Sequence, residues 1–342
     1  MGPSRRGVLR TGLYSVALTV PGRPEIVDRV QAFRGGRLSR IGMGEVAVVT
    51  AMTRRIQELD DQFGTRHARP LAANFLVNTA VPYLRADADE NVRAALLSAT
   101  ARLCHLTGYM AVDEGLHGLA QRYYVKALEF ADAADDRFAY SGTLRGMSVQ
   151  ATDLGHAATA LRLADAAAEG AHGAPQPRRA FFAGQQAHAA QTGDRQTALR
   201  HLATAERAMS RADLGGAAFA SYDPAALNDH VSQVRWELGD IAGAVASLRA
   251  SNRGLHVGYQ RTTVRRRFML AERYLRLGHL DVACATWARA LDDYPGIDSG
   301  RVDERVAAMK ALLRPHRGNG AARAVLARAD TPARARGAAG VP

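Results

Sequence analysis

A pattern of glycine and small residues recurs five times between residues 115 and 290, and it limits the possible folds more than any other feature of the chain. In each copy a glycine is followed by alanine five residues later, by a packing residue after nine and by a small residue after twelve. Successive glycines are 40, 38, 46 and 39 residues apart. A period of this length is typical of solenoids built from helix pairs. The copies are Gly115/Ala120/Tyr124/Ala127, Gly155/Ala160/Ala164/Ala167, Gly193/Ala198/Leu202/Ala205, Gly239/Ala244/Leu248/Ser251 and Gly278/Ala283/Trp287/Ala290.

Each copy predicts a helix, a turn and a second helix. The glycine stands between two amphipathic stretches, where a helix ends most easily on a residue without a Cβ. The alanine lets the second helix lie close to the first, and the residue one turn later supplies a larger packing group. Tyr274 and Pro295 bring the fifth copy close to the tetratricopeptide consensus. The pattern therefore predicts an all-α, tetratricopeptide-like solenoid, a right-handed superhelix of antiparallel helix pairs.

The flanking sequence also has helical patterns. We expect amphipathic helices over 43–64 and 70–86, and the first helix of the first repeat over 88–112. Asp223 followed by Pro224 predicts a helix start after a longer connection, and a closing helix is expected over 299–316. The predicted organisation is a basic segment at 1–40, a repeat domain at 41–315, and a short helix with a disordered basic tail at 316–342.

The net charge of +12 is concentrated at the two ends of the chain. Residues 1–40 carry eight arginines against two acidic residues, and residues 314–342 carry six against one, which leaves about +1 for the body. A nearly neutral body is not typical of a domain that grips DNA. Cys104 and Cys284 lie far apart without a CxxC pattern, so neither a disulfide framework nor a zinc module is expected.

The N-terminal stretch "SRRGVLRTGLYSVALTVPG" approximates a twin-arginine export signal. Its apolar run is short, and Pro21 and Gly22 stand where a small-x-small cleavage site would be expected. We therefore favour a cytoplasmic protein and keep export as a less favoured alternative. The sequence predicts no membrane span, because about 18–20 consecutive apolar residues would be needed.

Four segments resemble the repeat region of tetratricopeptide regulatory proteins from mycelial actinobacteria. They lie at 40–64, 106–136, 221–230 and 299–316, within a resemblance that covers about 40–315. The residues that carry it most specifically are Gly108, Asp113, Ala120, Gln121, Tyr123 and Tyr124. The resemblance implies regulation linked to development or antibiotic production. Many such proteins begin with a Cro/repressor-type helix-turn-helix, for which residues 1–40 offer no complete counterpart, so direct DNA binding is not expected.

A search for catalytic and metal-binding patterns predicts no catalytic residue, no metal and no cofactor. There is no dinucleotide fingerprint, Walker loop, GxSxG or HExxH. The best metal candidates are His105, His117 and the pair Asp113-Glu114, which lack a further ligand. Arg265-Arg266-Arg267 could meet phosphate or an acidic peptide, although a solvated helix face is the more common role of such a run. Tyr222, Asp223 and His230 are adequately explained by helix capping and packing.

The remaining candidate is a surface. The first helices of successive repeats line the concave face of such a solenoid, where peptides and partner helices usually bind. We therefore predict a non-enzymatic regulatory adaptor with a protein or peptide partner, and leave a homodimer open. The alternatives are a DNA-binding regulator whose helix-turn-helix is missing here, and an enzyme or exported binding protein. The repeat register predicts this set of inward-facing residues: Arg102, His105, Tyr109, Arg145, Val149, Asp229, Gln233, Arg265, Phe268 and Glu272.

Overall fold

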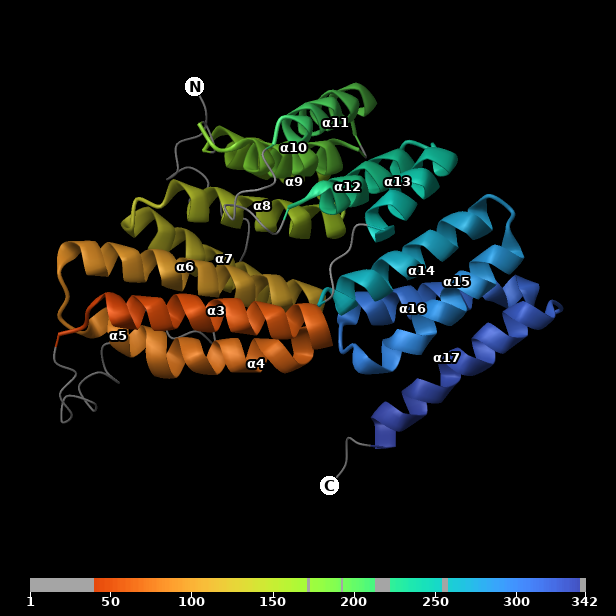
Figure 1. Ribbon diagram of the computed structural model, residues 1–342, viewed down its shortest axis with the longest axis horizontal. Coiled ribbons are helices and arrows are strands. Elements are labelled where there is room, and N and C mark those ends of the chain that lie inside the picture. Colours follow the sequence, from red (N-terminus) through yellow and green to blue (C-terminus); the bar gives the residue numbers. More distant parts are fainter. Residues whose placement is uncertain (1–39, 171–172, 192, 213–221, 254–257, 339–342) are drawn as a thin grey trace. The chain divides into compact units, whose positions relative to one another are not determined.

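The computed structural model describes residues 40–170, 173–191, 193–212, 222–253 and 258–338 (Figure 1). These residues form helices joined by turns, without any strand. The predicted segment at 1–40 lies, except for Arg40, outside the described residues. The helices are α3 (Met43–Phe63), α4 (Thr65–Phe75), the π-helical turn η1 (Leu76–Ala80), α5 (Val81–Arg85), α6 (Glu90–Asp113), α7 (His117–Ala133), α8 (Arg137–Asp153), α9 (Ala157–Glu169), α10 (Gln176–Ala190), α11 (Arg195–Ser210), α12 (Pro224–Glu237), α13 (Ile241–Arg253), α14 (Gln260–Arg276), α15 (Leu280–Asp293), α16 (Gly300–Leu313) and α17 (Gly320–Ala338).

The five predicted helix pairs are present at the predicted positions. Helices α6/α7, α8/α9, α10/α11, α12/α13 and α14/α15 each pack closely against their partner, and the pairs can be followed in Figure 1. Asp223 caps α12 as expected, because its Oδ1 accepts a hydrogen bond from the backbone N of Ala226 at 2.8 Å. The repeat register therefore holds from α6 to α15.

Four of the five repeat glycines end the first helices in the left-handed conformation. Gly115, Gly155, Gly239 and Gly278 have φ values of 75°, 77°, 81° and 82°. The residue after each glycine donates its backbone N–H to a carbonyl five residues earlier, as Leu116 does to Ala111 at 2.8 Å. This is the Schellman arrangement, which satisfies otherwise free helix carbonyls and turns the chain. The glycine is required here because a Cβ is disfavoured at positive φ.

The alanines five residues after each glycine are buried within the helix pairs. All five are fully buried. The first pair also needs a small residue on the other helix, since a Cβ on Gly108 would come within 2.9 Å of the Tyr124 ring and 3.1 Å of the Ala120 carbonyl oxygen. Gly108 of α6 therefore makes room for the large Tyr124 of α7.

The N-terminal helices differ from the expectation at one boundary. Helix α4 begins at Thr65, five residues before the predicted start, and contains Pro70 within it. Gly64 ends the preceding helical segment with φ of 99°, and a Cβ there would lie 2.4 Å from the carbonyl oxygen of Asp298. The carbonyl oxygen of Phe63 accepts a hydrogen bond from the backbone N–H of Asp298 at 2.8 Å. The turn is therefore set by Gly64 and its close backbone neighbour, and not by the proline.

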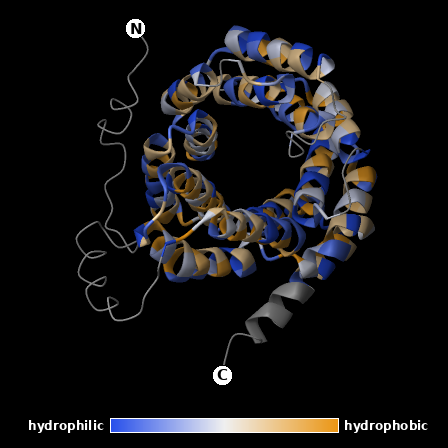
Figure 2. Ribbon diagram, turned by 60° about the vertical axis from the view of Figure 1, so that its left-hand side comes forward, coloured by the Kyte–Doolittle hydropathy of each residue, from blue (hydrophilic) through white to orange (hydrophobic). Residues whose placement is uncertain are grey.

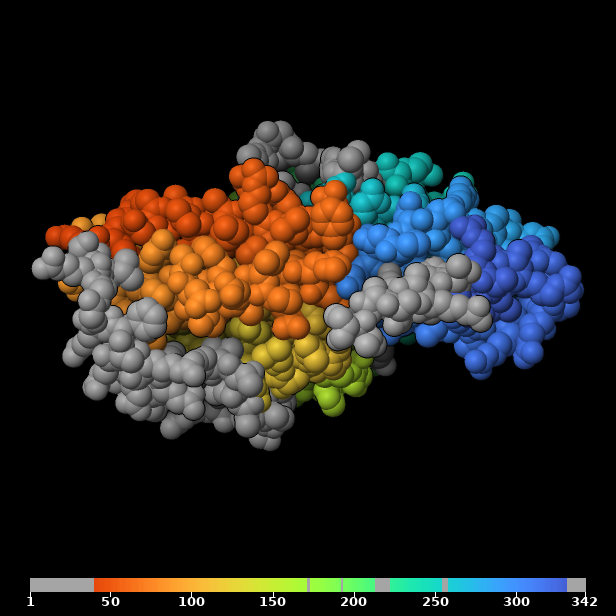
Figure 3. Space-filling model, turned by 90° about the horizontal axis from the view of Figure 1, so that it is seen from below, coloured from red at the N-terminus to blue at the C-terminus, as the bar shows by residue number. Residues whose placement is uncertain are grey.

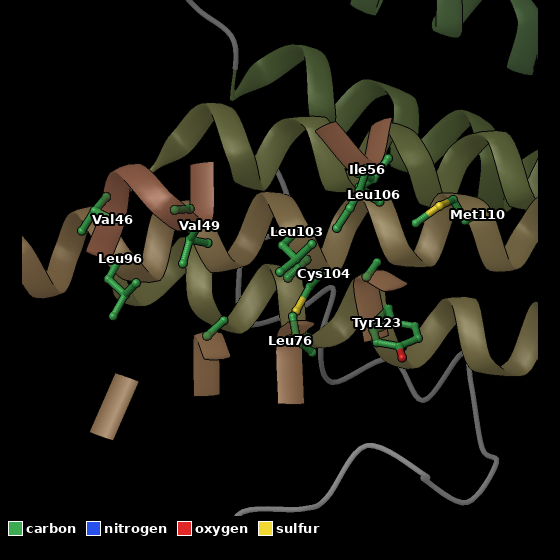
Figure 4. Close-up of a cluster of buried hydrophobic side chains, with 14 of the residues drawn as sticks. Val46, Val49, Ile56, Leu76, Leu96, Leu103, Cys104, Leu106, Met110 and Tyr123 are labelled. Atoms are coloured by element: carbon green, nitrogen blue, oxygen red, sulfur yellow. The ribbon is translucent and has the colours of Figure 1, made fainter. Parts of the chain in front are cut away.

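The chain divides into two compact units, the first comprising residues 1–59 and 66–174 and the second residues 60–65 and 175–342. The core of the first unit is built mainly from α3, α4, η1, α6 and α7. Figure 4 shows three of its side chains together, Val49 of α3, Leu103 of α6 and Tyr123 of α7. On the surface of this unit α3 and α4 lie side by side (Figure 3), with Val48, Met52 and Leu71 exposed.

The core of the second unit gathers apolar residues of α14, α15, α16 and α17 around Trp287 and Phe268. Ser299 caps the closing helix α16, which runs over the predicted region. Helix α17 extends to Ala338, so it continues into the stretch expected to be disordered. Arg261 forms a buried ion pair with Asp60 at 2.9 Å within this unit.

The surfaces of the helices mix polar and apolar residues. Figure 2 shows both kinds along the helices of the repeats. Among the described residues, none of the helices combines the length and the apolar character that a membrane span requires.

Candidate functional site

The ten residues predicted to face a partner divide equally between the two units. Five lie on the first helices α6 and α8 of the first unit, and five on the first helices α12 and α14 of the second. Most are half-buried, as expected for side chains that line a face between neighbouring helices.

In the first unit Arg102 is the most exposed of the set. Its Nη2 lies 3.0 Å from Oδ2 of Asp136, the residue that caps α8. The Asp136 carboxylate also accepts a hydrogen bond from Ser98 Oγ at 2.5 Å. Burial would raise the pKa of Asp136, but the hydrogen bonds from Ser98 and from the backbone of Ala139, with the Arg102 charge, lower it. Arg102 is therefore exposed enough to contact a partner while its guanidinium stays paired with the ionised carboxylate of Asp136.

His105, one turn further along α6, packs against Tyr124 of α7 and Gly146 of α8. Its ring centroid lies 5.7 Å from that of Tyr124, and a Cβ on Gly146 of α8 would come within 2.9 Å of its Cε1. Burial, assisted by the positive charge of Arg145, lowers the pKa of His105 to about 4. The imidazole is therefore neutral near pH 7. Tyr109, Arg145 and Val149 are half-buried along the same two helices.

In the second unit Asp229 of α12 is the centre of a charged cluster. Its Oδ2 accepts a hydrogen bond from Arg265 Nη2 at 3.2 Å and lies 3.4 Å from Arg266 Nε. Burial would raise the pKa of this carboxyl, but the guanidinium groups of Arg266 and Arg265 outweigh it and hold the pKa at about 2. The side chain is consequently an anion at any physiological pH.

The other three predicted residues of the second unit have different roles. Gln233 is half-buried on α12, and Glu272 accepts from Arg305 Nη1 at 3.3 Å. Phe268 is only 1% exposed and packs edge-on against Tyr294, with ring centroids 6.4 Å apart. The repeat register placed it on the binding face, but its side chain belongs to the core. We therefore remove Phe268 from the candidate site.

One arginine of this cluster, Arg273, was missed by the sequence analysis, and Arg266 was considered there only as part of the run 265–267. Arg266 and Arg273 are 5% and 3% exposed, so the arginine run at 265–267 is not the solvated face that such runs usually form. Arg273 donates to the Ser232 carbonyl oxygen at 3.5 Å and lies 5.4 Å from the Trp236 ring centroid. The spacing of seven residues, which places both on one side of a helix, was the available signal.

The remaining chemically interesting residues serve packing. Within the described part of the chain no three His, Cys, Asp or Glu side chains come together in a way that could hold a metal ion. His117 accepts a hydrogen bond through its carbonyl oxygen from Gln150 at 2.9 Å. Both cysteines are buried thiols, and burial raises the pKa of Cys104 to about 12 and also raises that of Cys284.

Tyr222 and His230 form a buried contact between α12 and the segment before it. The Tyr222 hydroxyl lies 2.8 Å from His230 Nδ1, and the His230 ring stacks on His188 of α10 with centroids 6.1 Å apart. A Cβ on Gly184 would come within 2.5 Å of both Tyr222 and His230. The tight fit leaves no room for a substrate between these groups, so packing accounts for them.

Comparison with known proteins yields a structural match. No protein-family model matches the chain, and no curated protein matches it. Among solved structures, a Rap protein complexed with competence and sporulation factor is similar, with a TM-score of 0.51 over 83% of this chain and 86% of that one. The two sequences are 14% identical, so the similarity concerns the fold. Together with the five helix pairs, it shows that this chain has an all-α, tetratricopeptide-like helical-repeat fold.

Proposed function

We propose that the chain is a non-enzymatic regulatory protein that binds a protein or peptide partner through its first helices. The proposal is supported by the polar and charged side chains of Gln233, Asp229 and Arg265 on α12 and α14, which the repeat register assigns to the face that helical repeats commonly use for recognition. The half-buried residues of α6 and α8 would extend this surface in the first unit.

Two further observations support a regulatory role. The solved Rap protein with a similar fold was determined with competence and sporulation factor bound. The sequence resemblance to actinobacterial repeat regulators points to the control of development or secondary metabolism in the cytoplasm. We infer that this chain acts by binding a partner.

The experiment is an affinity capture of the full-length protein from the cytosol of its own organism, followed by mass spectrometry. The test variant is Arg145→Ala/Arg265→Ala, which removes two half-buried charges from first helices α8 and α14. The matched control is Arg249→Ala/Arg289→Ala, which removes two exposed charges from second helices α13 and α15. Both variants have the same net charge.

We expect a partner that the wild type and the control retain and that the test variant loses at least tenfold. Equal retention by all three proteins would contradict binding through the first helices. A nuclease treatment tests the alternative of a DNA-binding regulator. Proteins that nuclease releases from the bait were held there through nucleic acid.

A further inference from the structure

Helix α3 carries a second apolar face beside the one that it buries. Val49 and Ile56 lie in the core of the first unit. On the other side of the helix Val48, Met52 and Leu59 are 45%, 40% and 38% exposed. No other helix among the described residues exposes more than one large apolar side chain. A helix that is apolar on two sides is normally covered on both, so the exposed face of α3 calls for a partner surface.

The exposed face has the spacing of a contact between two helices. Val48, Met52, Arg55 and Leu59 follow one another at intervals of four, three and four residues. These intervals place the four side chains in one line along the helix, as the a and d positions of a heptad do. Arg55 fits such a line because its aliphatic stem covers apolar surface while its guanidinium stays in water. We call these four residues the α3 row.

The intervals of the α3 row read the same in both directions. A second α3 that runs antiparallel to the first therefore places its Leu59 against Val48 and its Arg55 stem against Met52. Each of these contacts occurs twice about a twofold axis. A parallel copy in register would instead place the two Arg55 side chains against each other, which like charges disfavour. The row therefore fits an antiparallel copy of itself.

The charges beside the row allow two copies to approach. Arg55 Nη1 lies 2.7 Å from Glu58 Oε2, and Arg54 Nε lies 3.7 Å from Glu58 Oε1. The guanidinium in the row thus has a counter-charge in its own chain. A second copy consequently meets apolar side chains and an arginine that is already paired.

The contact is small for a protein interface. Helix α4, which lies beside α3 on this surface (Figure 3), adds the exposed Leu71. Standard stable interfaces bury about 1,200–2,000 Å², and one row with a few neighbours falls at the low end, so we expect a dissociation constant of about 10–100 μM.

We propose that the chain forms an antiparallel homodimer through the α3 row. Val48 packs against Leu59 of the second copy, and Met52 packs against the stem of Arg55 of the second copy. The twofold axis closes the contact, so the assembly stops at two copies. The inference goes beyond the proposed function, because it assigns this surface to a second copy and not to the regulated partner.

The first test is sedimentation equilibrium of the full-length protein over about 1–200 μM, a range that brackets the expected constant. The test variant Arg55→Leu makes the row entirely apolar. Its matched control is Arg54→Leu, because Arg54 is equally exposed, at 70% against 68%, and lies beside the same Glu58, but stands outside the row. We expect Arg55→Leu to dimerise at least tenfold more tightly than the wild type, Arg54→Leu to match the wild type, and Met52→Glu to be monomeric.

The second test fixes the direction of the two helices by oxidising cysteine variants and separating them without reductant. Val48 and Leu59 of one chain are eleven residues apart, which is about 16 Å along the helix and too far for a disulfide. The native Cys104 and Cys284 are buried. We expect Val48→Cys/Leu59→Cys to form a covalent dimer, and each single variant to stay monomeric because the antiparallel pair separates identical positions by the same length.

Three results would overturn the proposal. One is a wild type that is monomeric at every concentration, which would leave the α3 row to another partner. Another is a Met52→Glu variant that still dimerises, or equal tightening in Arg55→Leu and Arg54→Leu, since either would place the contact elsewhere. The third is a covalent dimer from a single cysteine variant as readily as from the double one, which would exclude the antiparallel direction. The capture experiment decides the proposed function independently of all three.

Discussion

The two units solve the same packing problem with opposite chemistry. In the first unit α6 lies close to both α7 and α8. Gly108 of α6 makes room for Tyr124 of α7, and Gly146 of α8 makes room for His105 of α6. In the second unit α12 and α14 stay farther apart, and arginines fill the interval. One repeat frame therefore gives a tightly packed layer with glycines in one place and a layer of buried arginines around a carboxylate in the other.

The largest effect is expected from removing the buried anion of the charged layer. Asp229→Ala leaves Arg266 buried without its counter-charge, and breaking a buried pair in this way costs about 3–5 kcal/mol of unfolding free energy. Equilibrium denaturation with urea measures the change.

The control is Asp293→Ala on α15, which removes the half-exposed partner of Arg267, the neighbour of Arg266 on α14. Exposed pairs contribute roughly 0–1 kcal/mol, so the control should change little. A similar loss in the two variants would mean that Asp229 is not the electrostatic centre of the cluster.

The glycines of the first unit give the next effect. Gly108→Ala places a methyl group against the Tyr124 ring and the Ala120 carbonyl oxygen, and overpacking of this kind costs about 1–3 kcal/mol. Gly142→Ala is the matched control on α8, because a Cβ there meets no atom within 4 Å. It should stabilise the protein by roughly 0.5–1 kcal/mol through helix propensity. Thermal unfolding of both variants distinguishes crowding from propensity, and a stabilised Gly108→Ala would contradict the close approach.

Some of these structural features could be predicted from the sequence and others could not. The positions of the five turns could be predicted because a turn glycine, which has a positive φ in four of the copies, is followed after five residues by a fully buried alanine in all five. Phe268 was misplaced because one helix face can turn by a fraction of a residue without disturbing the repeat. Arg266 could not be recognised as buried from the sequence, since the distance between α12 and α14 is a tertiary property. The start of α4 depends on the backbone of Asp298, which is distant in sequence.

Lowering the pH should reduce the stability contributions of the two layers in different pH ranges. His105 has a folded-state pKa of about 4 against an ordinary value of 6.5, so the unfolded chain binds a proton first as the pH falls. Its stability contribution is complete above pH 6.5 and is lost between pH 6.5 and 4, at about 1.4 kcal/mol per pH unit at most. Asp229, with a pKa of about 2, loses its contribution only below the ordinary aspartate value of 3.8.

Proton NMR titration of the histidine signals measures this difference directly. We expect the His105 signal to titrate near pH 4 and to shift upward in Arg145→Met, because Arg145 opposes protonation. A His105 that titrates near 6.5 in the folded protein would contradict its burial against Tyr124.

The smallest effect concerns the exposed end of the first-unit face, where stability and recognition can be separated. Asp136→Ala removes the cap of α8 and should cost about 0.5–2 kcal/mol. Arg102→Ala removes only an exposed charge from the same pair, and a change of roughly 0–1 kcal/mol is expected. Because Arg102 contributes so little to folding, any loss of partner retention in Arg102→Ala reflects contact with the partner. A destabilisation equal to that of Asp136→Ala would instead assign Arg102 to the helix cap, and the first unit would then present only the half-buried residues of α6 and α8 to a ligand.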